Sequence, residues 1–321
     1  ELVRDDLHVP WYDSAIPCSV WRVPCGDVSL LLFDPASQDH FFRRGFVYGQ
    51  PDDVLRFAFF CKAVLEHVLH DGQRPDVLHC HDWHTSLVPV LLFEIFQNEG
   101  IRDLHVCTTV HNFCHQGKTD GEMLRATGLG RPAHFYEPGR LQDPSDPRAL
   151  NLLKGGIVYS NFVTTVSPHH AWEARFDNQA FGLESILALH HAKFGGILNG
   201  LDWEIWDPAT DPNLDVPYRD AQGKAANRTA LRAELGLAES ERPLVSFIGR
   251  LDAQKGLELV LHTMKWCLAH EAQFVLLGTS PDPGVNEQFW QLRRQLGQSE
   301  NCRLEIAFDS RLAHRIYAAS D

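Results

Sequence analysis

Short apolar runs alternate along the chain with longer segments whose apolar residues recur at helical spacing. Residues 76–80, 104–112 and 162–168 are runs of strand length, whereas residues 52–72 and 85–100 carry apolar side chains with a helical period. Strands separated by helices are typical of βαβ units, because parallel neighbours need a long crossover connection. The pattern therefore predicts an α/β protein with a mostly parallel sheet.

Local signals mark where some of these elements begin and end. Residues 19–23 and 28–34 are predicted to pair as a β-hairpin across the turn 24–27. Ser167 and Pro168 are typical of the N-cap and the first position of a helix, so a helix is expected directly after the strand that precedes them.

A proline-rich connector divides the chain. Residues 207–224 hold three prolines and are predicted to be extended. The alternation then resumes with helix 224–237, strand 243–250, helix 256–271 and strand 272–278. We expect two doubly wound domains, residues 1–195 and 196–321, facing a cleft. Residues 131–148 hold four prolines and are predicted to form a long surface loop, a candidate lid.

Composition narrows the function classes. The chain has 321 residues, 44% of them hydrophobic, and a net charge of −13 without a Lys/Arg-rich run, so neither nucleic acid nor an anionic membrane surface is an expected partner. No apolar stretch is long enough for a transmembrane helix. The eight cysteines form no C-x-x-C pair and indicate reduced thiols.

Residues 246–260, "SFIGRLDAQKGLELV", predict an anion site. Arg250 and Lys255 lie in a turn between a strand and a helix that Gly256 opens, and helix N-termini attract anions. Two cations at this point suit a diphosphate, and they would neutralise charge as a metal does elsewhere. The alternative is that both are ordinary surface residues of a βα turn.

Polar residues also follow the strands of the first half. His111 and Asn112 end one strand, at the sheet edge where α/β proteins bind ligands. In "DVLHCHDWHTSLV", residues 76–88, strand alternation places His79 and His81 on one face and Cys80 and Asp82 on the other. A metal site would need further ligands from His84, His111 or His115, so cleft or core histidines are the favoured interpretation. Trp203 and Trp206 either stack sugars or pin the connector.

At this point several segments together resemble one family. "HCHDWHTSLVP", "TVHNFCHQG", "KGGIVYSNFVTTVSP", "FGLESIL", "FGGILNGLDWEIWDP" and "GRLDAQKGLELV" occur in the order and spacing of the bacterial glycogen synthases and plant starch synthases. The resemblance runs from about residue 40 to residue 321. It implies a GT-B fold, with two Rossmann-like doubly wound domains facing a cleft.

The resemblance implies retaining transfer of glucose from ADP-glucose (UDP-glucose in some relatives) to the non-reducing end of an α-1,4-glucan, without a metal or cofactor. By position, Arg250 and Lys255 would hold the distal diphosphate, and His111 would lie near the transferred glucose with its carbonyl facing the anomeric carbon. Asp82 and Trp83 would lie in the sugar and acceptor region. Further contacts implied are Asn112 and Asn199 with sugar and phosphate, Phe308 with adenine, and Tyr48 on the sugar side.

Two family motifs are absent from the sequence. The K-x-G-G-L nucleotide-binding loop does not precede Glu1, and the acidic E-P-C-G-L-type motif does not follow "HRIYAASD". The sequence is therefore interpreted as an interior fragment with a truncated C-terminal domain, expected to be inactive alone. The expected location is the cytoplasm, or the plastid in a plant or alga.

Three alternatives to a glucan synthase remain. Another nucleotide-sugar glycosyltransferase of the same fold is one, although "HDWH" with "TVHN" disfavours it. The second is a non-catalytic module that binds glucan or nucleotide without turnover. A metal-dependent hydrolase is the weakest, because it requires a bound metal that the spacing of the histidines does not favour.

Overall fold

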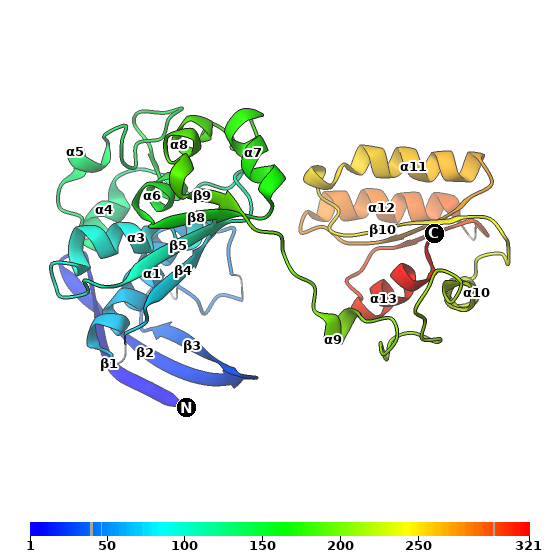
Figure 1. Ribbon diagram of the computed structural model, residues 1–321, viewed down its shortest axis with the longest axis horizontal. Helices are drawn as coiled ribbons and strands as arrows, with labels where there is room; N and C mark the ends of the chain where they lie inside the picture. Colours follow the sequence, from blue (N-terminus) through cyan, green and yellow to red (C-terminus); the bar gives the residue numbers. More distant parts are fainter. Residues whose placement is uncertain (39–40, 46, 73, 298) are drawn as a thin grey trace. The chain divides into compact units, whose positions relative to one another are not determined.

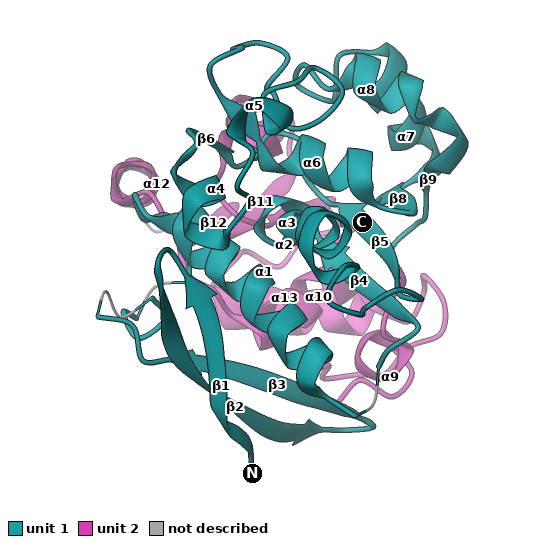
Figure 2. Cartoon of the chain, turned by 90° about the vertical axis from the view of Figure 1, so that its left-hand side faces the viewer, with its two compact units in different colours: residues 1–199 teal, residues 200–321 magenta. Residues whose placement is uncertain are grey.

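The chain forms two compact units, residues 1–199 and residues 200–321 (Figure 2). The computed structural model describes residues 1–38, 41–45, 47–72, 74–297 and 299–321. The division falls just after the predicted boundary at residues 195 and 196. Strand β9 (Phe194–Gly196) pairs with β8 (Phe162–Thr165), so the whole of β9 belongs to the first unit.

The first unit is built on a four-stranded parallel sheet in the order β4-β5-β8-β9 (Figure 1). Strand β4 spans Val77–His81 and β5 spans His105–Val110. Cys80 and Val106 point into the core, where they join side chains of α1 (Asp53–His70) and α3 (Leu87–Leu91). The apolar runs of the sequence therefore correspond to parallel strands, as predicted.

A second, antiparallel sheet precedes the parallel one in the chain. The predicted hairpin is confirmed as β2 (Ser14–Cys25) and β3 (Val28–Pro35), and β1 (Leu2–Trp11) adds a third strand that was not predicted. Buried residues of β1, such as Leu7 and Val9, join the same core as α1. This sheet therefore extends the core of unit 1 beyond the βαβ units.

The predicted helix over residues 85–100 is wrong in detail, because the segment begins at the last residue of α2 (Asp82–Thr85) and then holds two short elements. They are α3 and the π-helical turn η1 (Leu92–Phe96), in which Gln97 N–H donates to the carbonyl of Leu92. A π-helical turn changes the direction of the side chains that follow it. Here it presents Glu94 to the segment that follows residue 130.

The predicted helix start at Ser167 is confirmed. The Ser167 hydroxyl accepts a hydrogen bond from His170 N–H at the start of α7 (Pro168–Phe176). The other elements of unit 1 are β6 (Lys118–Thr119), α4 (Glu122–Thr127), α5 (Pro132–Phe135), β7 (Leu150–Asn151), α6 (Leu152–Tyr159), α8 (Glu184–Leu189) and η2 (His191–Lys193).

The second unit has a parallel sheet in the order β10-β11-β12, with helices on both faces (Figure 1). Helices α11 and α12 pack on one face, and α10 and α13 on the other. Its elements are α9 (Trp203–Trp206), α10 (Lys224–Leu235), β10 (Leu244–Ile248), η3 (Ala253–Lys255), α11 (Leu257–Ala269), β11 (Gln273–Leu277), α12 (Pro283–Leu296), β12 (Cys302–Glu305) and α13 (Ser310–Ala319).

The predicted connector runs between α9 and α10, and its residues 207–223, all described, contain no helix or strand. In the part of the chain that the structure describes, no helix is both long and apolar enough to cross a membrane. A parallel sheet with helices on both faces is the Rossmann-like arrangement, and its ligands bind beyond the carboxyl ends of the strands. Those ends are the places to look for a site in each unit.

Candidate functional site

Three histidines lie together where β4 and β5 end. His81 Nδ1 and His111 Nε2 are 3.0 Å apart, and the rings of His79 and His81 lie 4.3 Å apart between centroids. His79 Nε2 contacts the Thr109 hydroxyl at 2.7 Å. A cavity of about 210 Å³ is lined by these residues together with Asn199. The predicted placement of His79 and His81 on one face is confirmed.

The electrostatics of this group favour a neutral imidazole at His81. Burial lowers the pKa of His81, and the neighbouring His79 and His111 lower it further. A neutral imidazole has one donor and one acceptor nitrogen, so one of His81 and His111 donates to the other. Among the described residues, no group of three or more His, Cys, Asp or Glu side chains is arranged to hold a metal ion.

Asp82 does not follow the alternation of the strand, because β4 ends at His81. Its backbone has a left-handed φ of 55°, which is uncommon outside glycine. The carboxylate Oδ1 accepts hydrogen bonds from the backbone N–H groups of His111 at 2.7 Å and of Asn112 at 3.3 Å. Asp82 therefore fixes the backbone at the end of β5, including the position of the His111 carbonyl.

Trp83 and Tyr48 lie away from the lining of the histidine cavity. The indole of Trp83 covers Gly117, where φ is +61° and where an added Cβ would collide with the ring. Trp83 also stacks with His84, and the ring of Tyr48 lies 6.2 Å from that of His84. Tyr48 itself is exposed. The structure thus brings together His111 and Asn199, while Trp83 packs against the core of unit 1 and supports the turn after β5 through Gly117.

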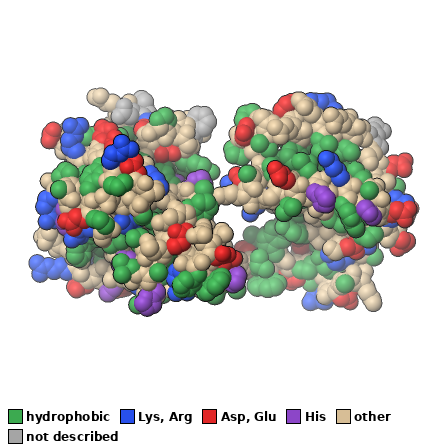
Figure 3. Space-filling view, turned by 90° about the horizontal axis from the view of Figure 1, so that it is seen from above, with side chains coloured by type: hydrophobic (Ala, Val, Ile, Leu, Met, Phe, Trp, Pro, Cys, Tyr) green, Lys and Arg blue, Asp and Glu red, His purple; other side chains and the backbone are tan. Residues whose placement is uncertain are grey.

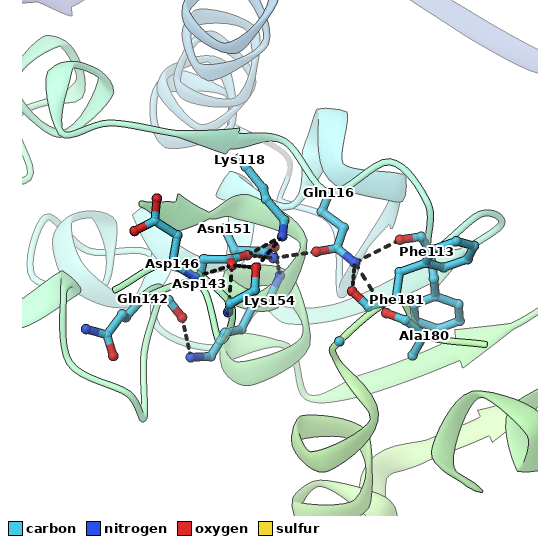
Figure 4. Close-up of polar contacts among 12 residues, drawn as sticks. Phe113, Gln116, Lys118, Gln142, Asp143, Asp146, Asn151, Lys154, Ala180 and Phe181 are labelled. Carbon is cyan, nitrogen blue, oxygen red and sulfur yellow. Dashed lines mark hydrogen bonds and ion pairs between the residues drawn. The ribbon is translucent and has the colours of Figure 1, made fainter. Parts of the chain in front are cut away.

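A buried polar network anchors the same turn (Figure 4). The Gln116 side-chain amide donates to the carbonyls of Phe113, Ala180 and Phe181, and its Oε1 accepts from Asn151 Nδ2 at 2.7 Å. The "HNFCHQG" turn is thereby tied to the "FGLES" segment. Sequence patterns did not reveal these contacts, because they join residues 35 to 65 positions apart.

The network continues to a fully buried carboxylate, Asp143. Asn151 Nδ2 donates to it at 2.8 Å, and Lys118 Nζ lies 3.0 Å from it. Burial by itself would raise the pKa of Asp143, but hydrogen bonds from Ser145, Asn151 and Lys118 outweigh burial and hold the pKa well below its usual range. The charge is therefore retained inside the protein, where it organises the loop before α6.

Two further contacts fasten residues 131–148. Lys154, at the start of α6, donates to the carbonyls of Pro138 and Gln142 at 2.7 and 2.6 Å. At the start of the segment, the buried Glu94 side chain accepts from Arg131 at 2.9 Å and contacts His134 at 3.0 Å. The segment predicted to be a long surface loop, a candidate lid, has no helix or strand apart from α5, and these contacts hold it at its start and in its middle.

The second unit has a larger cavity, of about 350 Å³, at the carboxyl ends of β10 and β11. Gly249 and Gly278 form part of its lining, and an added Cβ at Gly278 would collide with the Gly249 carbonyl. Two strand ends therefore meet closely enough that only backbone lies between them. The aromatic residues of the lining are Trp206, Phe308 and Tyr317.

Arg250 lines this cavity and is exposed. Among the described residues it has no side-chain hydrogen bond or ion pair, so its guanidinium is available to an anion. Lys255 does not line the same cavity; it lies in η3 beside a smaller one with Gly256. The structure therefore brings Arg250 and Phe308 together but places Lys255 apart from them.

Phe308 is 90% exposed, so its ring is open to a ligand. Of the residues that sequence reasoning did not assign to the site, Gly278, Thr279 and Tyr317 line the cavity. The position of Gly278 at the end of the predicted strand 272–278 was an available signal, since ligands bind at strand ends. No comparable signal marked Tyr317, because it lies within a helix and not at the end of a strand.

The chain matches the family described as starch synthase catalytic domain over residues 2–189. It is 50% identical over 319 residues to glycogen synthase 2 of Methylococcus capsulatus, covering 99% of this chain and 66% of that protein. It is 49% identical over 322 residues to a probable glycogen synthase 2 of Synechocystis sp., covering 98% of this chain and 65% of that protein.

A solved structure is also similar. The catalytic domain of starch synthase IV from Arabidopsis thaliana, bound to ADP and acarbose, matches with a TM-score of 0.94 and 39% sequence identity, covering 100% of this chain and 66% of that one. The chain thus spans slightly less than two thirds of the length of each of these relatives.

Two Rossmann-like units with cavities at the ends of their parallel strands define an α/β protein of the GT-B class, and the predicted fold class is confirmed. The chain belongs to the starch synthase catalytic domain family, the family of the bacterial glycogen synthases. The resemblance drawn from its motifs is therefore confirmed as well. The roles of individual residues and the cleft between the domains stay predictions.

Proposed function

We propose that this chain carries nucleotide-sugar and acceptor sites of a glucan synthase that transfers glucose from ADP-glucose to the non-reducing end of an α-1,4-glucan with retention. The observation that carries the proposal is the unit 2 cavity. It combines the unpaired cation Arg250, as far as the structure describes the chain, with an aromatic wall that includes Phe308. A phosphate group and a purine base need these two chemistries side by side.

Arg250 would stabilise the negative charge that builds on the diphosphate as the glucosyl bond breaks. Lys255 is proposed to assist from η3, where its exposed side chain is available at the N-terminal side of α11. With these two cations in place, we propose that transfer needs neither a metal nor another cofactor. A cationic side chain can supply the charge stabilisation that a metal ion supplies elsewhere.

In unit 1, His111 and its neighbours are proposed to hold the transferred glucose and the acceptor. Asp82 fixes the backbone at His111 and Asn112, so a carbonyl aimed at the anomeric carbon would keep its direction during transfer. Asn199 shares the cavity with His111 and is proposed as a sugar or phosphate contact. Trp83 is proposed to act beside Asp82 in the sugar and acceptor region, and Tyr48 on the sugar side.

The proposed partners are ADP-glucose and an α-1,4-glucan, in the cytoplasm or, in a plant or alga, in the plastid. Nucleic acid and membranes are not proposed as partners. On the face in Figure 3, Lys and Arg side chains are scattered among acidic ones, whereas a nucleic-acid surface concentrates basic residues.

Binding is tested first, on the 321-residue chain. Calorimetric titration is expected to show ADP binding that Arg250→Ala weakens strongly, with ADP preferred to UDP. Arg219→Ala, which removes an exposed arginine of the connector outside the cavity, is the matched control and should leave the affinity unchanged.

Transfer is tested in a chimera that adds the segments of the Methylococcus capsulatus relative lying outside the matched residues. Label from ADP-glucose should enter glycogen, and Arg250→Ala should reduce the rate by about 100-fold or more. A chimera that binds ADP and glycogen but transfers no glucose would support the alternative, a non-catalytic binding module.

A further inference from the structure

Two aromatic rings of α13 contact the indole of Trp206 at the wall of the unit 2 cavity. Its ring lies 3.8 Å from the ring of His314 between centroids, with an interplanar angle of 6°, and the ring of Tyr317 meets it edge-on at 5.6 Å. His314 and Tyr317 are one turn apart on α13. One face of the indole is therefore covered by His314, and Trp206 still contributes to the cavity lining.

His314 is itself fixed by a buried carboxylate from the connector. Its Nδ1 contacts Asp211 Oδ2 at 2.5 Å, and the two residues are 3% and 6% exposed. The other carboxylate oxygen of Asp211 accepts from the backbone N–H and the side chain of Asn213. Burial would raise the pKa of Asp211, but these hydrogen bonds outweigh burial and hold the pKa below its usual value, so the carboxylate stays ionised and orients the imidazole.

We infer that Asp211 and His314 are positioning residues of the unit 2 cavity, which hold the indole of Trp206 as a preset wall for the aromatic base of a nucleoside diphosphate. The inference rests on the proposed function, since it assumes that this cavity takes the nucleotide. Asp211 orients His314, His314 sets the plane of the indole, and the indole lies in the lining with Phe308. This Asp211–His314 contact, the relay, joins residues 103 positions apart and so also fastens the connector to α13.

A preset wall changes affinity in a specific way. Stacking between a base and an aromatic side chain contributes substantially to binding, and an aromatic ring that is already immobile loses less freedom when the ligand binds. Without the relay the indole remains but must be ordered by the ligand. We expect the dissociation constant for ADP to rise about 5- to 10-fold, whereas a ligand without a base should be unaffected.

The test compares ADP with inorganic pyrophosphate, both titrated calorimetrically into the 321-residue chain. Asp211→Asn keeps the size of the side chain and removes its charge, and His314→Leu removes the stacked ring. Both variants should bind ADP more weakly and pyrophosphate as the wild type does, because Arg250 is retained. A general loss of structure would instead weaken both ligands.

Unit 2 offers a matched control. His270 stacks on Trp266 at 4.4 Å and 13° at the C-terminal end of α11, where both residues are exposed and lie outside the cavity, so His270→Leu removes a similar pair and should change neither affinity. An Asp211→Asn variant with wild-type affinity for ADP overturns the relay, however His314→Leu behaves. A wild-type chain that binds neither ligand refutes the proposed nucleotide site, and the relay with it.

Discussion

Replacing Asn151 with alanine removes three hydrogen bonds at one fully buried point of unit 1. The Asn151 side chain donates to Gln116 and Asp143 and accepts from Lys154 N–H as the N-cap of α6. Loss of the N-cap costs about 1 kcal/mol. Leaving the buried Gln116 oxygen without a donor costs about 1–3 kcal/mol, and the lost bond to the charged Asp143 about 1.5 kcal/mol. We expect a total destabilisation of about 3.5–5.5 kcal/mol.

Urea unfolding followed by far-UV circular dichroism measures this loss. With a slope of about 2–3 kcal/mol per molar urea, the midpoint of unit 1 should fall by about 1–3 M. The transition of unit 2 is identified as the one that Leu231→Ala lowers, because Leu231 is buried in the core between α10 and α13.

Asn161→Ala is the matched control. Asn161 is exposed, and its side chain accepts one hydrogen bond from Val106 N–H, so the expected loss is about 1 kcal/mol. If Asn151→Ala lowers the unit 1 midpoint no more than Asn161→Ala does, the network contributes little and the reasoning is refuted. Combining Asn151→Ala with Gln116→Ala should cost clearly less than the sum of the single changes, since the two side chains share a bond.

Three other changes test separate features. Gly278→Ala should destabilise unit 2 by about 1–3 kcal/mol and abolish ADP binding, because its Cβ collides with the Gly249 carbonyl; a normally stable, ADP-binding variant would contradict this close approach. Burial would raise the pKa of Glu94, but hydrogen bonds from His134 and Tyr159 outweigh it and hold the pKa below 4.5. Glu94→Gln should therefore lower the urea midpoint above pH 4.5, with a gap to wild type that narrows as the pH falls further; a gap independent of pH would count against the pairing. Burial raises the pKa of Glu66 to about 7, above its unfolded value of 4.5, so ionisation costs stability as the pH rises. Glu66→Gln should gain about 2–3 kcal/mol relative to wild type between pH 5 and pH 8, and parallel profiles would show that Glu66 ionises freely.

Local patterns were sufficient to predict much of the fold. Short apolar runs located β4, β5, β8, β10 and β11, and helical spacing located α1, α10 and α11, whereas β12, α12 and α13 were not predicted. The Ser167 N-cap was found because its signal lies within a few residues. The π-helical turn at Leu92–Phe96 was missed, since apolar spacing over residues 85–100 fits an uninterrupted helix almost equally well. The Glu94 side chain in this turn contacts Arg131 and His134, which are too distant in the chain for local spacing to reveal.

The candidate site was predictable only in part, for a related reason. Strand alternation placed His79 and His81 on one face, and strand ends indicated His111 and Arg250. The bonds of Asp82 to the backbone of His111 depend on a left-handed φ that no spacing rule predicts. Gln116 and Asp211 act through partners distant in the chain, so a single sequence gives no signal for their roles.

The meeting of Gly249 and Gly278 has a consequence for how this cavity can change. Its floor is backbone, and at Gly278 sterics leave no room for a side chain that selection could vary. Phe308, Tyr317 and Thr279 stand around that floor on separate elements and can be exchanged without moving it. Ligand preference can therefore change through these walls while the floor stays constant, which makes these three positions the natural targets for redesigning which ligand the cavity prefers.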